Sequence, residues 1–199
     1  MNRKETEILL SDILSAPEAI SPELYQYYNG LSKRRIILNS QIGEGIVEWV
    51  ILPLLDMDND GSGKPIEIIL STPGGSVFDG LCLCNVIDNL KTPTTIKVMG
   101  YAYSMGGLIL AAGYDNPNVR KVCYPFSSAL FHAGSTYFDG AANIVKDTFH
   151  FTEKMEEKIK NYVVSHSKIT EEEYTKKERF EWYLCAEDML RLGLVDEIL

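Results

Sequence analysis

The chain has 199 residues, 45% of them hydrophobic, and a formal net charge of -9. That length is enough for one domain with a substantial core that needs neither disulfides nor a structural metal. The acidic balance argues against nucleic acid as a partner, because binding to a phosphate backbone depends on clustered lysine and arginine.

The cysteines and the hydropathy pattern predict a cytoplasmic protein. The cysteines lack the Cys-x-x-Cys spacing and histidine-rich surroundings of zinc sites, so we expect free thiols in a reducing compartment and no metal. They are Cys82, Cys84, Cys123 and Cys185. No apolar run is long enough to span a bilayer, and the first residues do not resemble a secretory signal. We expect no membrane association.

The N-terminal part of the chain differs in character from the rest. We expect residues 1–22 to form a leader or mobile segment and residues 23–199 to form one domain. Apolar residues recur at helical spacing over residues 6–19, although Pro17 limits any helix there. A tyrosine-rich stretch follows and ends at Asn29-Gly30, a pair that is typical of turns.

Strand and helix patterns then alternate along the chain. Strands are predicted at residues 35–38, 66–70, 94–98, 119–124 and 128–132, and helices at about 44–55, at 77–90 and after Ser104. This repetition predicts an α/β fold in which helices pack on a largely parallel sheet.

One polar segment matches the spacing of a calcium-binding loop. The residues from Asp56 to Glu67 fit the EF-hand pattern of carboxylates. However, Pro65 stands where the second helix of an EF-hand must begin, and the residues after it are typical of a strand. We therefore interpret the segment as a polar loop that joins a helix to a strand.

The longest predicted helix runs from about Gly140 to Ser165, with an apolar stripe and charged residues opposite it. A helix of about 24 residues spans roughly 36 Å, which is longer than a compact domain of this size needs. It either projects to meet another subunit or flanks the core. Beyond it, Thr170 opens a short helix with a capping box, another helix is expected at 186–192, and 194–198 is expected to be a strand.

Ser104 lies at the junction between a β-branched strand and a helix rich in leucine and alanine. Gly100, Gly106 and Gly107 allow a sharp turn there, and the first N–H groups of the new helix have no partner within it. Such a junction suits a nucleophile that must form and stabilise an oxyanion. Taken alone, the same pattern is more often a buried helix with a serine N-cap.

Three features stand together: Ser104 at its junction, an upstream Gly74-Gly75 turn, and His132 closing a later strand. With their order and surroundings, they resemble the proteolytic subunit of the Clp protease from about Tyr25 to Leu199. The matching pieces are Arg35-Ile-Ile-Leu, Ser71-Thr-Pro-Gly-Gly-Ser-Val, Ser104-Met-Gly-Gly, Leu110-Ala-Ala-Gly, Phe131-His, Asp139-Gly-Ala-Ala, Leu184-Cys-Ala-Glu-Asp and Gly193-Leu-Val-Asp. Each piece is weak by itself, but their shared order and spacing make the resemblance highly specific.

The resemblance implies a serine peptidase with the crotonase-like fold, a spiral of repeated strand-strand-helix turns with a protruding long helix. It implies that Ser104 is the nucleophile and that His132 is the general base. The backbone N–H groups of Gly75 and Met105 match the family's oxyanion hole. No cofactor is implied.

This chain departs from the family at the third catalytic position, where Glu181 stands in place of an aspartate. Glutamate can hold an imidazole in the required tautomer, so we expect Glu181 to complete the triad. Asp188 and Glu178 are the alternative carboxylates. Asp196 matches a family carboxylate that we interpret as structural.

A second departure follows His132, where Ala133 to Tyr137 replace the family's Gln-Pro and Gly-Gly pairs. In the family this glycine-rich strand lies beside the bound peptide and helps the rings meet, so substrate preference and ring contacts are open here.

The resemblance also implies partners. The family forms a heptameric ring, usually doubled to a tetradecamer, which degrades unfolded polypeptides delivered by a separate ATP-dependent unfoldase. This chain has no nucleotide-binding motif of its own. Three alternatives stay open: a non-catalytic ring subunit, a viral capsid-maturation protease of the same fold, and a crotonase-like acyl-CoA enzyme that needs no serine nucleophile.

Overall fold

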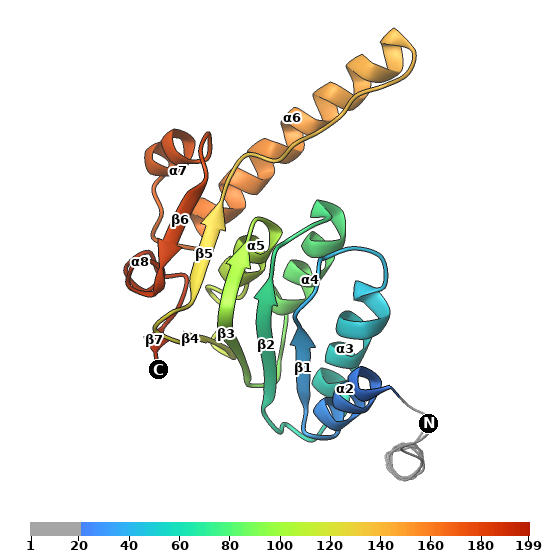
Figure 1. The fold of residues 1–199 in the computed structure, drawn as a ribbon, viewed down its shortest axis with the longest axis vertical. Helices are drawn as coiled ribbons and strands as arrows, with labels where there is room; N and C mark the ends of the chain where they lie inside the picture. The colour runs from blue at the N-terminus through green and yellow to red at the C-terminus, as the bar shows by residue number, and fades with distance from the viewer. Residues whose placement is uncertain (1–20) are drawn as a thin grey trace.

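A mostly parallel sheet of seven strands organises residues 21–199, the part of the chain that the computed structural model describes (Figure 1). The strands are β1 (Arg35–Leu38), β2 (Ile66–Thr72), β3 (Thr94–Tyr103), β4 (Val119–Cys123), β5 (Ser128–Phe131), β6 (Trp182–Cys185) and β7 (Glu197–Ile198). The parallel order is β1-β2-β3-β4-β7, while β5 pairs with β3 and β6 pairs with β5. The expectation of an α/β fold with a largely parallel sheet is confirmed.

The long strand β3 is shared between two neighbours. Its first half, Thr94 to Val98, pairs with β4, and its last residues, Tyr101 to Tyr103, pair with β5. Both pairings are parallel. The carboxyl ends of β3 and β5 therefore lie side by side, which is where polar side chains of parallel sheets meet.

The helices of residues 21–199 cover the sheet and extend beyond it (Figure 1). They are α2 (Pro22–Ser32), the π-helix η2 (Val47–Ile51), α3 (Leu52–Asn59), α4 (Val77–Asp88), α5 (Met105–Ala111), α6 (Ala142–Ser165), α7 (Glu171–Lys177) and α8 (Ala186–Arg191). The alternating burial of β2, with Ile66, Ile68 and Leu70 inside, shows that one sheet face carries the core. None of these helices has an apolar stretch that could cross a membrane.

The turn expected at Asn29-Gly30 is wrong, because both residues lie inside α2. The Ser21 side chain caps this helix by accepting a hydrogen bond from Leu24 N–H, so the tyrosine-rich stretch is helical. A methyl group on Gly30 would lie 3.1 Å from the carbonyl oxygen of Arg35. This glycine therefore allows close packing against β1. The helix expected over residues 6–19 lies outside the described residues.

The polar loop expected to begin at Asp56 is also corrected, since α3 continues to Asn59 and contains both Asp56 and Asp58. Asp58 accepts hydrogen bonds from the backbone N–H groups of Lys91 (3.0 Å) and Thr92 (2.7 Å). The carboxylate therefore ties α3 to the turn before β3, and loop structure begins only after the helix.

Two C-terminal strands differ from expectation. The strand expected at residues 194–198 is reduced to β7, Glu197–Ile198, and β6, Trp182–Cys185, was not predicted. The strand β6 forms because β5 offers it a pairing edge, a long-range contact that its four residues do not specify by themselves.

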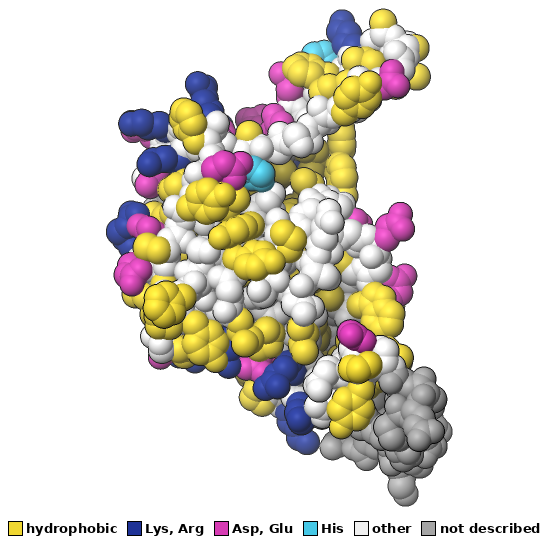
Figure 2. Space-filling view, in the orientation of Figure 1, with side chains coloured by type: hydrophobic (Ala, Val, Ile, Leu, Met, Phe, Trp, Pro, Cys, Tyr) yellow, Lys and Arg dark blue, Asp and Glu magenta, His cyan; other side chains and the backbone are white. Residues whose placement is uncertain are grey.

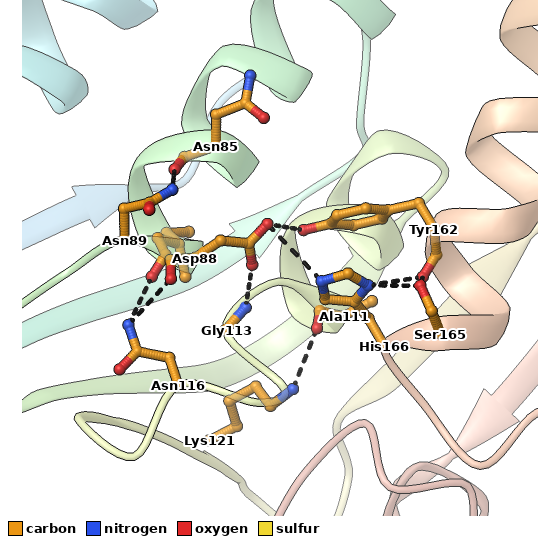
Figure 3. A network of polar contacts seen from close by, with 11 residues as sticks. Asn85, Asp88, Asn89, Ala111, Gly113, Asn116, Lys121, Tyr162, Ser165 and His166 are labelled. Carbon is orange, nitrogen blue, oxygen red and sulfur yellow. Dashed lines mark hydrogen bonds and ion pairs between the residues drawn. The ribbon is translucent and has the colours of Figure 1, made fainter.

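The long helix α6 extends well past the sheet (Figure 1), and of its 24 residues only Val163 is buried. The choice between projecting and flanking the core is thus settled in favour of projection. Its base is tied to α4 where Tyr162 donates a hydrogen bond to Asp88 at 2.8 Å (Figure 3). His166 stacks on Tyr162 with ring centroids 3.9 Å apart. Burial raises the pKa of Tyr162, and the nearby Cys84 and Asp88 add to that effect.

Lys121 on β4 is a buried cation, with only 2% of its surface exposed. Its Nζ donates to the carbonyl oxygen of Ala111 at 3.3 Å. Burial lowers its pKa to about 8, although the carboxylates of Asp196 and Asp88 act in the opposite direction. Asp196 also accepts the backbone N–H of Lys121 at 2.7 Å, so its contacts are with β4.

The pH dependence of stability in the variant Lys121→Met tests whether burial lowers the pKa of Lys121. The folded-state pKa near 8 lies below the ordinary value of 10.5, so the unfolded chain binds more protons between these pH values. The free energy of unfolding of the wild type should therefore rise relative to that of Lys121→Met from pH 8 to 10, by roughly 2 kcal/mol. Urea unfolding at several pH values measures this difference. The exposed Lys146→Met serves as control, and a difference that stays constant with pH for Lys121→Met contradicts the prediction.

Candidate active site

Ser104 occupies a strained position between β3 and α5. Its backbone has φ of 54° and ψ of -117°, in a region that residues with a side chain rarely adopt. Its N–H donates to the carbonyl oxygen of Leu130 at 2.9 Å, which holds the end of β3 against β5. The hydroxyl therefore projects at the carboxyl edge of the sheet.

Two glycines allow the first turn of α5 to approach its neighbours closely. A methyl group on Gly106 would lie 2.7 Å from Cγ2 of Thr72, and one on Gly107 would lie 3.1 Å from the carbonyl oxygen of Leu130. Larger residues would push α5 away from β2 and β5. These glycines therefore help to set the position of Ser104.

His132 follows β5 directly, and its Nε2 lies 2.9 Å from Ser104 Oγ. Its Nδ1 lies 3.0 Å from Oε1 of Glu181. In the antiparallel pairing of β5 with β6, Phe131 lies opposite Trp182, so one further residue along each strand brings His132 opposite Glu181. The structure thus brings the three expected side chains into one hydrogen-bonded row.

The two alternative carboxylates make other contacts. Asp188 accepts hydrogen bonds from Cys185 and Arg191 at the start of α8. Burial raises the pKa of the Glu178 carboxyl, a shift that Lys160 partly opposes. The backbone carbonyl of Glu178 accepts the N–H of Ala133 at 2.6 Å, so this residue helps to hold the chain after His132 in place.

The Gly74-Gly75 turn lies beside the nucleophile. A methyl group on Gly74 would come within 2.8 Å of Cβ of Ser104 and 2.9 Å of the Met105 nitrogen. Met105 is the first residue of α5, so its N–H has no partner within the helix. The backbone of the turn and the first turn of α5 are therefore adjacent.

The N–H of Gly75 is oriented by a bridge to Ile42. Ile42 N–H donates to the Gly74 carbonyl at 2.8 Å, and Ser76 N–H donates to the Ile42 carbonyl at 2.9 Å. In this parallel bridge the N–H of Gly75 points away from Ile42. A methyl group on Gly75 would lie 2.1 Å from the Ile42 carbonyl oxygen, so only glycine fits. We did not single out Ile42 from the sequence, because its contribution is made by backbone atoms.

This arrangement is the one that nucleophilic acyl transfer requires. It consists of a serine hydroxyl hydrogen-bonded to an imidazole, a carboxylate on the other ring nitrogen, and nearby backbone N–H groups. The His132 and Glu181 side chains are 31% and 56% exposed, so substrate and water can reach this row. In residues 21–199, no three His, Cys, Asp or Glu side chains converge in a way that could hold a metal ion.

Comparison with known proteins agrees with the resemblance seen in the sequence. The family described as Clp protease matches residues 20–199. The chain is 29% identical to ATP-dependent Clp protease proteolytic subunit 3 of Synechococcus sp. (strain CC9902), over 86% of each chain. It is 26% identical to proteolytic subunit 1 of Salinibacter ruber, over 88% of this chain and 74% of that protein. It is 24% identical to the proteolytic subunit of Deinococcus radiodurans, over 88% and 85%.

Removing the Glu181 carboxylate tests its place in the row. In Glu181→Ala, we expect the acylation of Ser104 by an activated ester to slow at least tenfold, because nothing then holds the imidazole tautomer. Glu181→Asp should retain more activity than Glu181→Ala. Release of p-nitrophenol in the first turnover measures the rate. The matched control is Glu178→Gln, and equal rates for Glu181→Ala and the control would count against a role for Glu181.

Proposed function

The chain belongs to the Clp protease family of serine endopeptidases, and we propose that Ser104, His132 and Glu181 carry out its peptide hydrolysis. The observation that supports this most directly is the 2.9 Å contact between His132 Nε2 and Ser104 Oγ. A non-catalytic ring subunit would have no need to keep that contact.

In this mechanism, Ser104 Oγ attacks the carbonyl carbon of the scissile peptide bond while His132 Nε2 takes the hydroxyl proton. The negative charge that develops on the carbonyl oxygen is stabilised by the N–H groups of Gly75 and Met105. His132 then delivers the proton to the leaving amine, and water, activated by the same imidazole, hydrolyses the acyl-enzyme. Glu181 keeps Nδ1 of the imidazole protonated and stabilises its positive charge.

We further propose that the chain acts in the cytoplasm as a heptameric ring, doubled to a tetradecamer, on unfolded polypeptides that a separate ATP-dependent unfoldase supplies. The relatives are named as proteolytic subunits of an ATP-dependent protease, which supports both an assembly and an ATPase partner. Hydrophobic side chains also gather on the face of the molecule seen in Figure 2. Exposed ones from β3 and β6 include Met99, Tyr101 and Tyr183. Contacts between subunits would cover such surface.

Labelling of the nucleophile tests the proposed chemistry. A tagged fluorophosphonate should acylate the assembled wild type at Ser104, and Ser104→Ala should remain unlabelled. His132→Ala should label at least a hundredfold more slowly, because the hydroxyl loses its base. Peptide mapping by mass spectrometry identifies the modified residue. Ser135→Ala, which removes an exposed serine three residues after His132, is the control, and label on any residue other than Ser104 would refute the assignment.

The size of the assembly and its action on folded and unfolded substrates test the proposed chamber. Sedimentation should show a particle of seven or fourteen copies of the 22.4 kDa chain. Without an ATPase, that particle should degrade a reduced and alkylated protein and leave the same protein intact when it is folded, because a closed chamber admits only extended chains. The two digests are compared by electrophoresis, with Ser104→Ala as control. A monomer that cuts both forms equally contradicts the chamber.

A further inference from the structure

A buried threonine directly precedes the candidate oxyanion turn. Thr72 is the last residue of β2 and is fully buried. Its Oγ1 accepts the N–H of Gly74 at 3.1 Å and donates to the carbonyl oxygen of Ser40 at 2.6 Å. The direction of both hydrogen bonds is fixed, because an amide N–H can only donate and a carbonyl oxygen can only accept. One hydroxyl therefore bridges two backbone segments that are distant in the sequence.

These two hydrogen bonds complete the set that holds the Gly74-Gly75 turn. Ile42 N–H donates to the Gly74 carbonyl, which belongs to the same planar peptide unit as the Gly75 N–H. Ile42 lies two residues after Ser40. The Thr72 hydroxyl therefore holds both the turn and the segment that orients the Gly75 amide. Thr72 supplies a side chain to this set, whereas the bonds of Ile42 join backbone to backbone.

Thr72 also contacts the helix that carries the other proposed oxyanion donor. A methyl group on Gly106, in the first turn of α5, would lie 2.7 Å from Cγ2 of Thr72. A methyl group on Gly74 would lie 2.9 Å from the Met105 nitrogen, so the turn itself is packed against the start of α5. The hydroxyl of Thr72 thus holds the turn, and its methyl group packs against the helix that begins at Met105.

We propose that the Thr72 hydroxyl is a positioning group for the oxyanion hole, which keeps the Gly75 N–H where the negative charge of the tetrahedral intermediate develops. Thr72 is buried behind the turn, so it acts through Gly75 and does not touch the substrate. Donors held in place in advance stabilise the transition state more than the bound substrate. Loss of the hydroxyl should therefore lower kcat and leave KM nearly unchanged. This inference rests on the proposed function, which supplies the oxyanion.

The variant Thr72→Val isolates the hydroxyl, because valine keeps the shape of threonine and its methyl contact with α5. For an internally quenched peptide, its kcat should fall about tenfold or more while KM stays within about twofold of the wild-type value, since removing one oxyanion donor outright costs roughly 10²–10³ in kcat. Thr72→Ser restores the hydroxyl and should keep most of the wild-type kcat. The matched control is Thr94→Val, which should leave kcat unchanged. It removes a similarly buried hydroxyl, bonded to the Thr92 carbonyl at 2.9 Å, at the opposite end of β3.

Inhibition by a peptide trifluoromethyl ketone separates positioning from a general loss of stability. Ser104 Oγ adds to the ketone carbon, its proton passes to His132, and the negative charge moves to the ketone oxygen, which takes the place of the oxyanion. The inhibition constant should rise in Thr72→Val by the factor by which kcat falls. The same peptide with a carboxamide in place of the ketone should inhibit both proteins equally. Sedimentation checks the assembly of each variant. Should Thr72→Val not assemble, Thr72→Cys gives the same comparison, because a thiol forms weak hydrogen bonds.

Three results would overturn the positioning role. In the first, Thr72→Val keeps the wild-type kcat. In the second, Thr72→Ser loses as much kcat as Thr72→Val, which would mean that the site depends on tight packing and not on the hydroxyl. In the third, kcat falls while inhibition by the ketone is unchanged. Fluorophosphonate labelling separates this failure from that of the proposed function: a labelled Ser104 in the wild type with unchanged kcat in Thr72→Val rejects the positioning role alone, and absence of labelling in the wild type rejects both.

Discussion

The antiparallel pairing of β5 with β6 is the constraint on which the candidate site depends. His132 leaves the end of β5 and Glu181 enters β6, so their meeting is a direct result of the pairing in which Phe131 faces Trp182. A slip of one residue would turn every side chain of β6 to the opposite face of the sheet and carry Glu181 away from the imidazole. The N–H of Ala133 also donates to the Glu178 carbonyl, which ties the chain just after His132 to the segment just before Glu181.

Close backbone packing is the second condition for the site. The Gly74-Gly75 turn, the end of β3 and the first turn of α5 approach so closely that side chains at the glycines would collide with neighbouring backbone. Ser104 itself adopts a positive φ, and surrounding contacts such as its hydrogen bond to Leu130 must maintain that strained conformation. These positions therefore require glycine because segments that are distant in the sequence pack too closely for a side chain. The local turn is a further reason.

The projecting helix α6 is attached at its base by a network of hydrogen bonds, and most of its length is exposed. Tyr162 and His166, at its C-terminal end, group around Asp88, which also accepts the N–H of Gly113 at 2.6 Å (Figure 3). This network connects α6 to α4, the helix that follows the Gly74-Gly75 turn. The stacked rings of Phe78 and Phe151 join the same two helices a second time.

Most of the strands and helices, the candidate nucleophile and base, and the family could be predicted from the sequence, whereas α2 and β6 could not. The predicted features follow from local information: β-branched runs, glycines around Ser104, a histidine closing a strand, and short motifs in a shared order. The resemblance favoured Glu181 over Glu178 and Asp188, but whether its carboxylate reaches His132 depends on tertiary structure, because it follows from the register of β5 and β6. Tertiary structure also decided that Asn29-Gly30 stays helical, that Ile42 orients the Gly75 amide, and that α6 projects, because each depends on contacts between segments far apart in the chain.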